Sequence, residues 1–304
     1  KTSSPRSEPR NVSPDSKPNK NRFTHVHEIL RVAEATLAAA GVASPRHDAH
    51  TLAAHLIGTD PLTVRLMSPT DLPATFHHDY AELISRRAHR EPLQHILGTA
   101  PFGPLTLTVG PGVFIPRPET EQLADWVATH LGGTPNPLII DLCTGSGAIA
   151  GYLAHARPDA NIYAVELSPE ALTYTHTNLD PLGVTIVAGD ATNPTLLEHL
   201  NGKATAVVTN PPYVPHTTDL QPEVYADPPM AVFGGDTGMD VITRLIPTAR
   251  RLLAPGGVFA CEHDDTTGPD VVKLVAEAGL RQVTQHQDWA GQPRFVTAIC
   301  DSTD

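Results

Sequence analysis

Four consecutive residues, Asn210, Pro211, Pro212 and Tyr213, form the most specific chemical motif of the chain. Each proline fixes its own φ and lacks an N–H, so the carbonyl groups of Asn210 and Pro211 can face outward as hydrogen-bond acceptors. With the Asn210 side-chain oxygen they can receive both hydrogens of a planar NH2 group, and the Tyr213 ring offers its face to a flat amide or base. The motif therefore predicts a site that holds an amide or amine nitrogen, and a plain proline turn is the alternative.

A glycine-rich turn lies earlier in the chain, where residues 141–147 read Asp-Leu-Cys-Thr-Gly-Ser-Gly. The turn follows an apolar run directly and precedes a helical pattern at residues 148–153. Such a turn lets a ligand approach the backbone closely, and the N-terminus of the following helix favours an anionic group. Many α/β proteins have a glycine turn after a strand, so this signal alone is weak and a tight turn without a ligand is the alternative.

Three acidic residues, Asp141, Glu166 and Asp190, each stand at the end of an apolar run. Glu166 lies 25 residues after Asp141, and a carboxylate there can bind both hydroxyls of a ribose, as the acid about 20 residues beyond the glycine turn does in dinucleotide-binding folds. The second phosphate-binding glycine of those folds is missing. The pattern therefore favours a ribose-bearing ligand that is not a dinucleotide.

The elements that must position these groups follow from the alternation of short apolar runs and helical segments. This alternation predicts a parallel sheet with helices on both faces, so that the three acids meet at one sheet edge. Too little sequence separates the last two runs for a crossover helix, so they should be antiparallel neighbours at the end of the sheet. The predicted strands are residues 138–142, 162–165, 185–188, 204–209, 258–262, 282–286 and 295–300.

Three segments precede the predicted sheet. Residues 1–22 contain four prolines and almost no large apolar residue, so we expect a disordered basic tail that cannot bury enough surface to offset its ordering entropy. Residues 23–89 show apolar positions at helical spacing, which predicts a small domain of four or five short helices. Residues 105–109 and 113–115 flank a Gly-Pro-Gly turn and predict a linking β-hairpin.

The composition is that of a globular protein, with 40% hydrophobic and 18% charged residues among 304. Three widely spaced cysteines without a CxxC pair suit a reducing compartment, and no apolar run approaches the ~20 residues that cross a bilayer. We therefore expect a cytoplasmic protein without membrane contact. Residues 1–22 carry a net charge of +4, which leaves −16 for the rest of the chain and disfavours duplex nucleic acid as the main partner.

Residues 23–300 resemble the release-factor glutamine methyltransferase family, often called PrmC or HemK. The matching stretches are residues 90–98 (REPLQHILG), 114–120 (FIPRPET), 141–147, 210–213, 234–239 (GGDTGM), 262–263 and 288–294 (DWAGQPR). The motif at residues 210–213 is shared with DNA adenine and RNA guanine methyltransferases. Residues 114–120 and the helical front domain are what single out the glutamine enzymes.

The resemblance implies an α/β fold of class I, a Rossmann-like seven-stranded sheet that uses S-adenosylmethionine. It assigns residues 23–98 to an N-terminal helical substrate-recognition domain, 99–116 to the linking β-hairpin and 117–304 to the methyltransferase catalytic domain. The implied reaction methylates the side-chain amide N5 of the glutamine in the Gly-Gly-Gln motif of peptide chain release factors. We expect a monomer that does not bind nucleic acid directly.

The resemblance also implies a role for each site residue. The methionine and ribose end of the cofactor would lie against Cys143, Thr144, Gly145, Ser146 and Gly147. Glu166 would hold the ribose hydroxyls, Asp190 would meet the adenine edge, and Phe114 would pack near the cofactor. The glutamine amide would be held by Asn210, Pro211, Pro212 and Tyr213, with Asn210 also beside the cofactor.

Two residues depart from the family pattern. Cys143 replaces the usual glycine, and Ala191 stands where many members have an aromatic residue against the adenine, so we expect a cost in cofactor affinity. We interpret Cys143 as a tolerated small residue and not as a nucleophile.

Other interpretations fit part of the sequence. An N6-adenine or N2-guanine nucleic-acid methyltransferase would use the same acceptors on a flipped base, and the charge of −16 counts against it. A non-catalytic protein that keeps the cofactor fold is another interpretation.

Histidines and acids at residues 47–50 and 262–265 lack a recognised ligand spacing, so we expect no metal site. Residues 219–229 are expected to form a lid or a substrate-contact loop.

Overall fold

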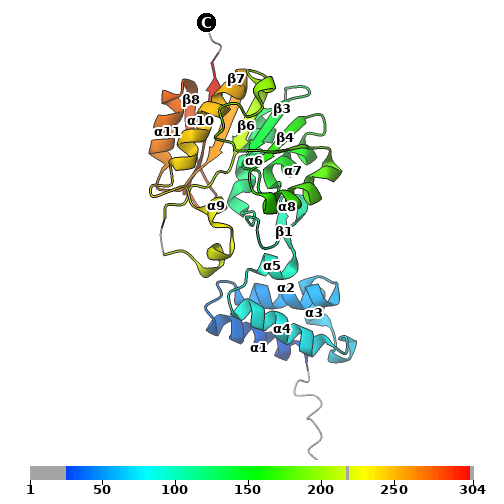
Figure 1. Cartoon of the computed structure of the whole chain (residues 1–304). Coiled ribbons are helices and arrows are strands. Elements are labelled where there is room, and N and C mark those ends of the chain that lie inside the picture. The colour runs from blue at the N-terminus through cyan, green and yellow to red at the C-terminus, as the bar shows by residue number, and fades with distance from the viewer. Residues whose placement is uncertain (1–24, 217–218, 302–304) are drawn as a thin grey trace, which may run out of the picture. The chain divides into compact units, whose positions relative to one another are not determined.

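The structure is a computed structural model that describes residues 25–216 and 219–301 (Figure 1). The chain divides into two compact units, Lys1–Ala88 and His89–Asp304. The predicted tail at residues 1–22 lies outside the described residues. Within the described ranges, no helix combines the length and the apolar character needed to cross a membrane.

The first unit consists of short helices, as the helical spacing predicts. They are α1 (Val26–Ala39), α2 (Pro45–Ile57), α3 (Pro61–Leu66), a 3-10 turn (Pro69–Asp71) and α4 (Phe76–Ala88). Their interior includes a buried ion pair, in which Arg87 Nε lies 2.7 Å from Asp48 Oδ2. His50 Nε2 lies 2.8 Å from Glu34 Oε1. The acid and one histidine of residues 47–50 therefore serve contacts between helices.

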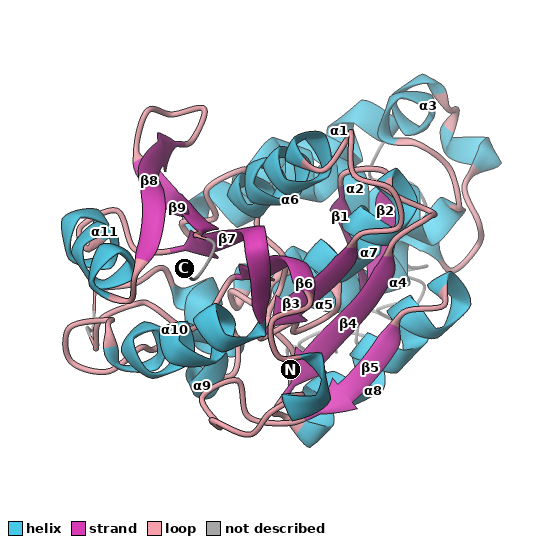
Figure 2. Cartoon of the chain, turned by 90° about the horizontal axis from the view of Figure 1, so that it is seen from above, coloured by secondary structure: helices cyan, strands magenta, loops and turns pink. Residues whose placement is uncertain are grey.

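The second unit is built on a seven-stranded sheet with the order β5-β4-β3-β6-β7-β9-β8. The five strands from β5 to β7 are parallel, and β9 pairs antiparallel with both β7 and β8, which confirms the predicted edge. Figure 2 shows β5 and β8 at the two ends of the sheet. The strands are β3 (Leu138–Leu142), β4 (Asn161–Glu166), β5 (Thr185–Ala188), β6 (Ala204–Thr209), β7 (Leu253–Glu262), β8 (Leu280–Gln287) and β9 (Pro293–Cys300).

Helices cover both faces of this sheet because successive strand residues point to opposite sides. Ile139 packs in one core with residues of α6, α7 and α8, whereas Ile140 packs in a second core with residues of α10 and α11. The helices are α5 (Leu93–Leu97), α6 (Pro118–His130), α7 (Ala148–Ala156), α8 (Pro169–Leu179), α9 (Pro229–Val232), α10 (Asp240–Leu252) and α11 (Gly268–Glu277). Short 3-10 turns stand at Asp180–Leu182, Glu198–Leu200 and Pro222–Ala226.

The hairpin before the sheet differs from the prediction in its strands. β1 (Thr99–Phe102) pairs antiparallel with β2 (Leu105–Thr108), so residues 105–109 pair with the segment before them and not with residues 113–115. Prolines flank the expected second strand, and a proline cannot donate to a strand ladder. The Ile115 N–H donates instead to Asp227 Oδ1 at 3.1 Å.

The strand order reverses at β3, which has β4 on one side and β6 on the other. In open α/β sheets, ligands bind outside the carboxyl ends of the strands at such a reversal. The glycine-rich turn follows β3, Glu166 ends β4 and Asn210 follows β6. The fold thus places the three predicted binding elements around one point.

Candidate active site

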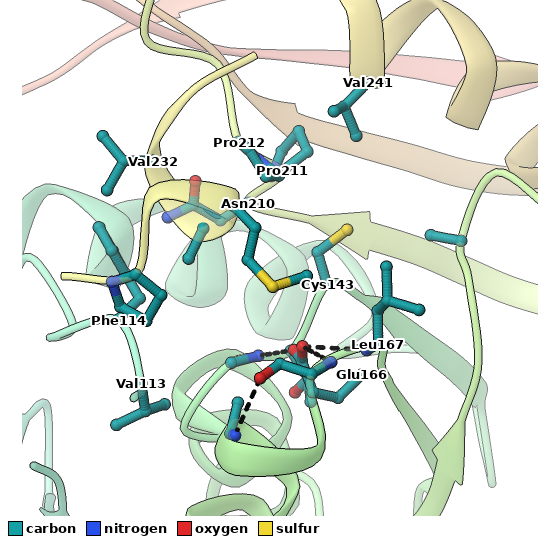
Figure 3. A pocket seen from close by; sticks show the side chains of 18 of the residues that line it. Val113, Phe114, Cys143, Glu166, Leu167, Asn210, Pro211, Pro212, Val232 and Val241 are labelled. Atoms are coloured by element: carbon teal, nitrogen blue, oxygen red, sulfur yellow. Dashed lines mark hydrogen bonds between the residues drawn. The ribbon is translucent and has the colours of Figure 1, made fainter. Parts of the chain in front are cut away.

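A cavity of about 490 Å³ lies at the carboxyl ends of β3, β4 and β6 (Figure 3). The predicted site residues that line it are Phe114, Cys143, Thr144, Gly145, Ser146, Glu166, Asp190, Asn210, Pro211, Pro212 and Tyr213. Gly147 does not line it. Gly147 precedes α7 with φ 86°, and a Cβ there would lie 2.7 Å from Leu179 Cγ. The glycine at this position therefore allows α7 and α8 to pack closely.

Glu166 is held rigidly by three backbone N–H groups (Figure 3). Gly145 donates to Oε2 at 2.8 Å, and Leu167 and Ser168 donate to Oε1 at 2.9 and 2.8 Å. A carboxylate offers about four acceptor positions, so Glu166 keeps one for a ligand hydroxyl. This geometry gives the cavity a fixed hydrogen-bond acceptor on the β4 side.

Cys143 adopts a left-handed backbone conformation with φ 61°, a region that glycine enters without steric cost. This conformation supplies a physical reason for a glycine at the position. Burial, together with the nearby carboxyl groups of Glu166 and Asp141, raises the pKa of the Cys143 thiol. The thiol therefore stays protonated and is a poor nucleophile.

Asp141 is the penultimate residue of β3 and is fully buried. Its Oδ2 accepts from the Thr144 hydroxyl at 2.5 Å and from the Ala150 N–H at 3.1 Å. Its Oδ1 is buried without a hydrogen-bond partner among the described residues. Burial is the main cause that raises the pKa of Asp141 to about 7. The hydrogen bond from Ala150 ties the first turn of α7 to Asp141.

Asp190 follows β5 and is fixed by its own turn, because Oδ1 accepts from the Thr192 N–H at 2.8 Å and from the Thr192 hydroxyl at 2.7 Å. The next residue, Ala191, is buried in the core that contains Ile140. Two partly exposed apolar side chains, Leu167 and Met230, also line the cavity. Sequence reasoning missed both, although Leu167 directly follows a predicted site residue.

The segment that begins at Asn210 is anchored through side chains and backbone. Asn210 Nδ2 donates to Thr120 Oγ1 at 3.1 Å, and the Tyr213 hydroxyl donates to Glu262 Oε1 at 2.7 Å. The Val214 N–H donates to the Val232 carbonyl at 3.0 Å. Burial and the Glu262 carboxyl raise the pKa of Tyr213 well above its ordinary value, so its hydroxyl stays protonated.

Two glycines let the segment 234–239 press against this backbone. A Cβ on Gly234 would lie 2.7 Å from the Pro212 carbonyl oxygen, and one on Gly238 would lie 2.2 Å from the Tyr213 carbonyl oxygen. No side chain fits in either space. The glycines of the GGDTGM stretch therefore buttress the motif at residues 210–213.

The predicted contact loop, residues 219–229, contributes Leu220, Val224 and Pro228 to the cavity wall. Two ion pairs hold it to the segment before α6. Arg117 Nη2 lies 2.5 Å from the buried Asp227 Oδ2, and the Arg117 guanidinium stands 4.9 Å from the centre of the Phe114 ring.

In the second ion pair, Arg90 Nη2 lies 2.6 Å from Glu223 Oε2. Sequence reasoning missed both pairs because their partners are more than 100 residues apart. Only the fold joins them.

The site offers fixed hydrogen-bonding groups with which to hold a reactant. Its thiol and its phenol are both protonated, and within the described residues no group of three or more His, Cys, Asp or Glu side chains could hold a metal ion. The fixed carboxylate of Glu166 and the motif at residues 210–213 both line this largely apolar cavity. These features favour recognition of a ribose on one side and of an NH2 group on the other.

Two family models match the chain. Residues 28–98 match the family model described as the PrmC N-terminal domain, and residues 105–268 match the model described as the methyltransferase small domain. Among solved structures, a methyltransferase from Pyrococcus furiosus is similar with a TM-score of 0.48 at 16% identity, covering 66% of this chain and 91% of that one.

Curated relatives match over nearly their whole length. A protein of Corynebacterium glutamicum named release factor glutamine methyltransferase is 52% identical over 275 residues, covering 89% of this chain and 97% of that protein. A protein of the same name from Mycolicibacterium smegmatis is 49% identical over 279 residues, covering 91% and 98%. The chain belongs to the release factor glutamine methyltransferase family.

Proposed function

We propose that this protein transfers a methyl group from S-adenosylmethionine to the side-chain amide N5 of the glutamine in the Gly-Gly-Gln motif of peptide chain release factors. The observation that carries the proposal is the shared cavity. Asn210, whose motif can accept from an NH2 group, lines the same space as the fixed carboxylate of Glu166. The named activity of the relatives supports the same reaction.

The residues of the cavity fit the cofactor. A volume of about 490 Å³ lies within the range that holds ligands of this size. Glu166 would hold the ribose hydroxyls, since its carboxylate is already fixed by three backbone N–H groups and faces the cavity with its remaining acceptor position. The turn at residues 143–146 would face the methionine and ribose end, Asp190 would meet the adenine edge, and Phe114 would pack near the cofactor. When bound, the cofactor supplies a methyl group on a positively charged sulfur.

The protein contributes positioning to the reaction. An amide nitrogen is a poor nucleophile because its lone pair is delocalised, so its NH2 must be held in line with the methyl group. The Asn210 side-chain oxygen and the carbonyl of Pro211 accept both N–H bonds and aim the nitrogen. Positioning of this kind can supply about 7 to 11 kcal/mol of the barrier.

The chemistry needs no strong base. As the nitrogen becomes pyramidal in the transition state, its hydrogen bonds to these acceptors strengthen, which stabilises the transition state more than the bound substrate. The nitrogen becomes acidic once it carries the methyl group, and its proton leaves to water. The protonated states of Cys143 and Tyr213 agree with a site that supplies neither a base nor a covalent nucleophile.

The release factor is the protein partner. Residues 23–98 recognise it, residues 99–116 link the domains and residues 117–304 carry the chemistry. The protein acts as a monomer in the cytoplasm without direct nucleic-acid binding. The net charge of −16 outside residues 1–22 repels phosphate backbones.

The test is mass spectrometry of a release factor incubated with this protein and S-adenosylmethionine. Wild type should add one methyl group to the Gly-Gly-Gln glutamine, and Asn210→Ala should abolish the gain. Asn161→Ala, which changes an exposed asparagine at the start of β4, is the matched control and should behave as wild type. An unmodified glutamine in a protein that still binds the cofactor would refute the release factor as substrate, and nucleic acids would be tested next.

A further inference from the structure

Behind the cavity, Asn210, Thr120 and Glu262 form a hydrogen-bonded network to which the proposed reaction assigns no role beyond that of Asn210. Asn210 Nδ2 donates to Thr120 Oγ1, and Thr120 lies beside the carboxyl of Glu262, which also accepts from Tyr213. Thr120 is 3% exposed and Glu262 is 1% exposed. The register of the sheet explains why Asn210 and Glu262 are neighbours. Thr209 in β6 pairs with Cys261 in β7, and Asn210 and Glu262 are the next residues of the two segments.

The orientation of the Asn210 side chain decides what the substrate meets. A carboxamide has an oxygen that accepts and an NH2 that donates. Only the oxygen can receive an N–H of a substrate amide. With the NH2 turned toward the substrate instead, two donors would face each other.

Thr120 can act in either direction, because a hydroxyl both donates and accepts. Its hydroxyl can donate to the Glu262 carboxyl, while its oxygen accepts from Asn210 Nδ2. When that proton points to Glu262, only lone pairs of Thr120 Oγ1 remain for Asn210. The NH2 side of Asn210 must then face Thr120.

Glu262 is suited to draw this proton. Its Oε1 accepts from Tyr213 at 2.7 Å, and its Oε2 is buried without a well-formed hydrogen bond among the described residues. A buried carboxyl oxygen that lacks partners attracts the nearest hydroxyl strongly. Burial raises the pKa of Glu262, while the hydrogen bonds from Tyr213 and Thr120 and the positive charge of Arg294 act in the opposite direction. Arg294 also pairs with Asp288 at 2.9 Å.

We propose that Glu262 is a positioning residue for methyl transfer, acting through Thr120 to keep the Asn210 side-chain oxygen turned toward the substrate amide. The inference rests on the proposed function for its substrate but names residues that do not touch that substrate. Glu262 accepts the Thr120 hydroxyl proton, and Thr120 Oγ1 then accepts from the Asn210 NH2 group. The Asn210 side-chain oxygen is therefore left to face the cavity.

The kinetic test uses the full chain with a release factor and S-adenosylmethionine. Thr120→Val keeps the shape and removes the hydroxyl, so kcat should fall at least about tenfold, while Thr120→Ser should stay within about twofold of wild type. Glu262→Gln can donate an N–H to Thr120 and reverse the chain, so it should lose about as much as Thr120→Val. The dissociation constant for the cofactor should not change in any variant.

Two further variants separate positioning from simple stability. The double variant Thr120→Val with Glu262→Gln should lose no more activity than either single variant, because both changes break the same chain. Thr248→Val removes a hydroxyl from a buried threonine of α10, which is 2% exposed and whose hydroxyl donates to the Asn193 carbonyl and not to Asn210, Thr120 or Glu262. It should lower the melting temperature to a similar extent and leave kcat unchanged.

A spectroscopic measurement tests the inference without turnover. In the wild-type protein the side-chain NH2 of Asn210 should show nuclear Overhauser contacts to Thr120, and Glu262→Gln should weaken them. Equal kcat for Thr120→Val and wild type, or equal losses for Thr120→Val and Thr120→Ser, would overturn the inference. A wild-type protein that leaves the release factor unmodified but shows the Asn210 contact would refute the substrate alone and leave the orientation intact.

Discussion

Gly238 offers a direct test of how the GGDTGM segment supports the motif at residues 210–213. Its φ is 77°, and an added Cβ would lie 2.2 Å from the Tyr213 carbonyl oxygen, where ordinary contact begins at 3.4 Å. In Gly238→Ala the backbone at Tyr213 or at residue 238 must therefore move by roughly 1 Å. A misplacement of about 1 Å in a site that works by positioning costs about 100-fold in rate, so kcat toward a release factor should fall by about that factor.

Gly256→Ala is the matched control for this experiment. Gly256 has the same φ of 77°, but nothing lies within 4 Å of an added Cβ. Both variants should lose about 1–2 kcal/mol of stability from the left-handed alanine, which lowers the melting temperature by about 2–8 °C for a protein of this size. Only Gly238→Ala should lose activity. A kcat within threefold of the Gly256→Ala value would refute the inference that close packing of Gly238 on Tyr213 holds residues 210–213 in place.

Two further outcomes are expected at the glycine-rich turn. Cys143→Gly removes the strain of φ 61° but also removes the packing of the thiol. The melting temperature should therefore stay within a few degrees of wild type, and the affinity for S-adenosylmethionine should not fall. A melting temperature lower by more than 5 °C would show that the lost packing outweighs the relieved strain. Asp141 has a pKa raised from 3.8 to about 7 by burial, so the folded state binds the extra proton and the free energy of unfolding should fall as the pH rises from about 4 to about 7. Asp141→Asn should flatten that slope in denaturant titrations, and an unchanged slope would assign it to another group.

The sequence predicted the sheet well because each strand is marked by its own residues. The runs at residues 138–142 and 204–209 are mostly apolar, which is typical of strands covered on both faces. The hairpin was predicted with the wrong partner strand. The alternation at residues 105–109 identifies a strand correctly, but only the surrounding contacts decide which neighbour it pairs with, and Asp227 binds the competing segment.

The candidate site was predictable where chemistry and position coincide. Glu166 ends a strand and Asn210 directly follows one, and both are polar residues after apolar runs, so their type and place already suggest a role. Thr120 and Glu262 stand in stretches that resemble the family and Asp227 stands in the expected contact loop, but only the fold brings each of them to a partner that lies tens of residues away.

The position of β9 between β7 and β8 has a consequence for how the chain folds. β7 pairs with β6 on one side, but its other edge has no partner until residues 293–300 are available. During synthesis, the buried residues Phe259, Ala260 and Cys261 therefore stand on an open strand edge, which is the kind of edge that recruits other chains. We expect the nascent protein to depend on chaperones or to aggregate until its last strand emerges, and truncation before residue 293 should yield insoluble protein.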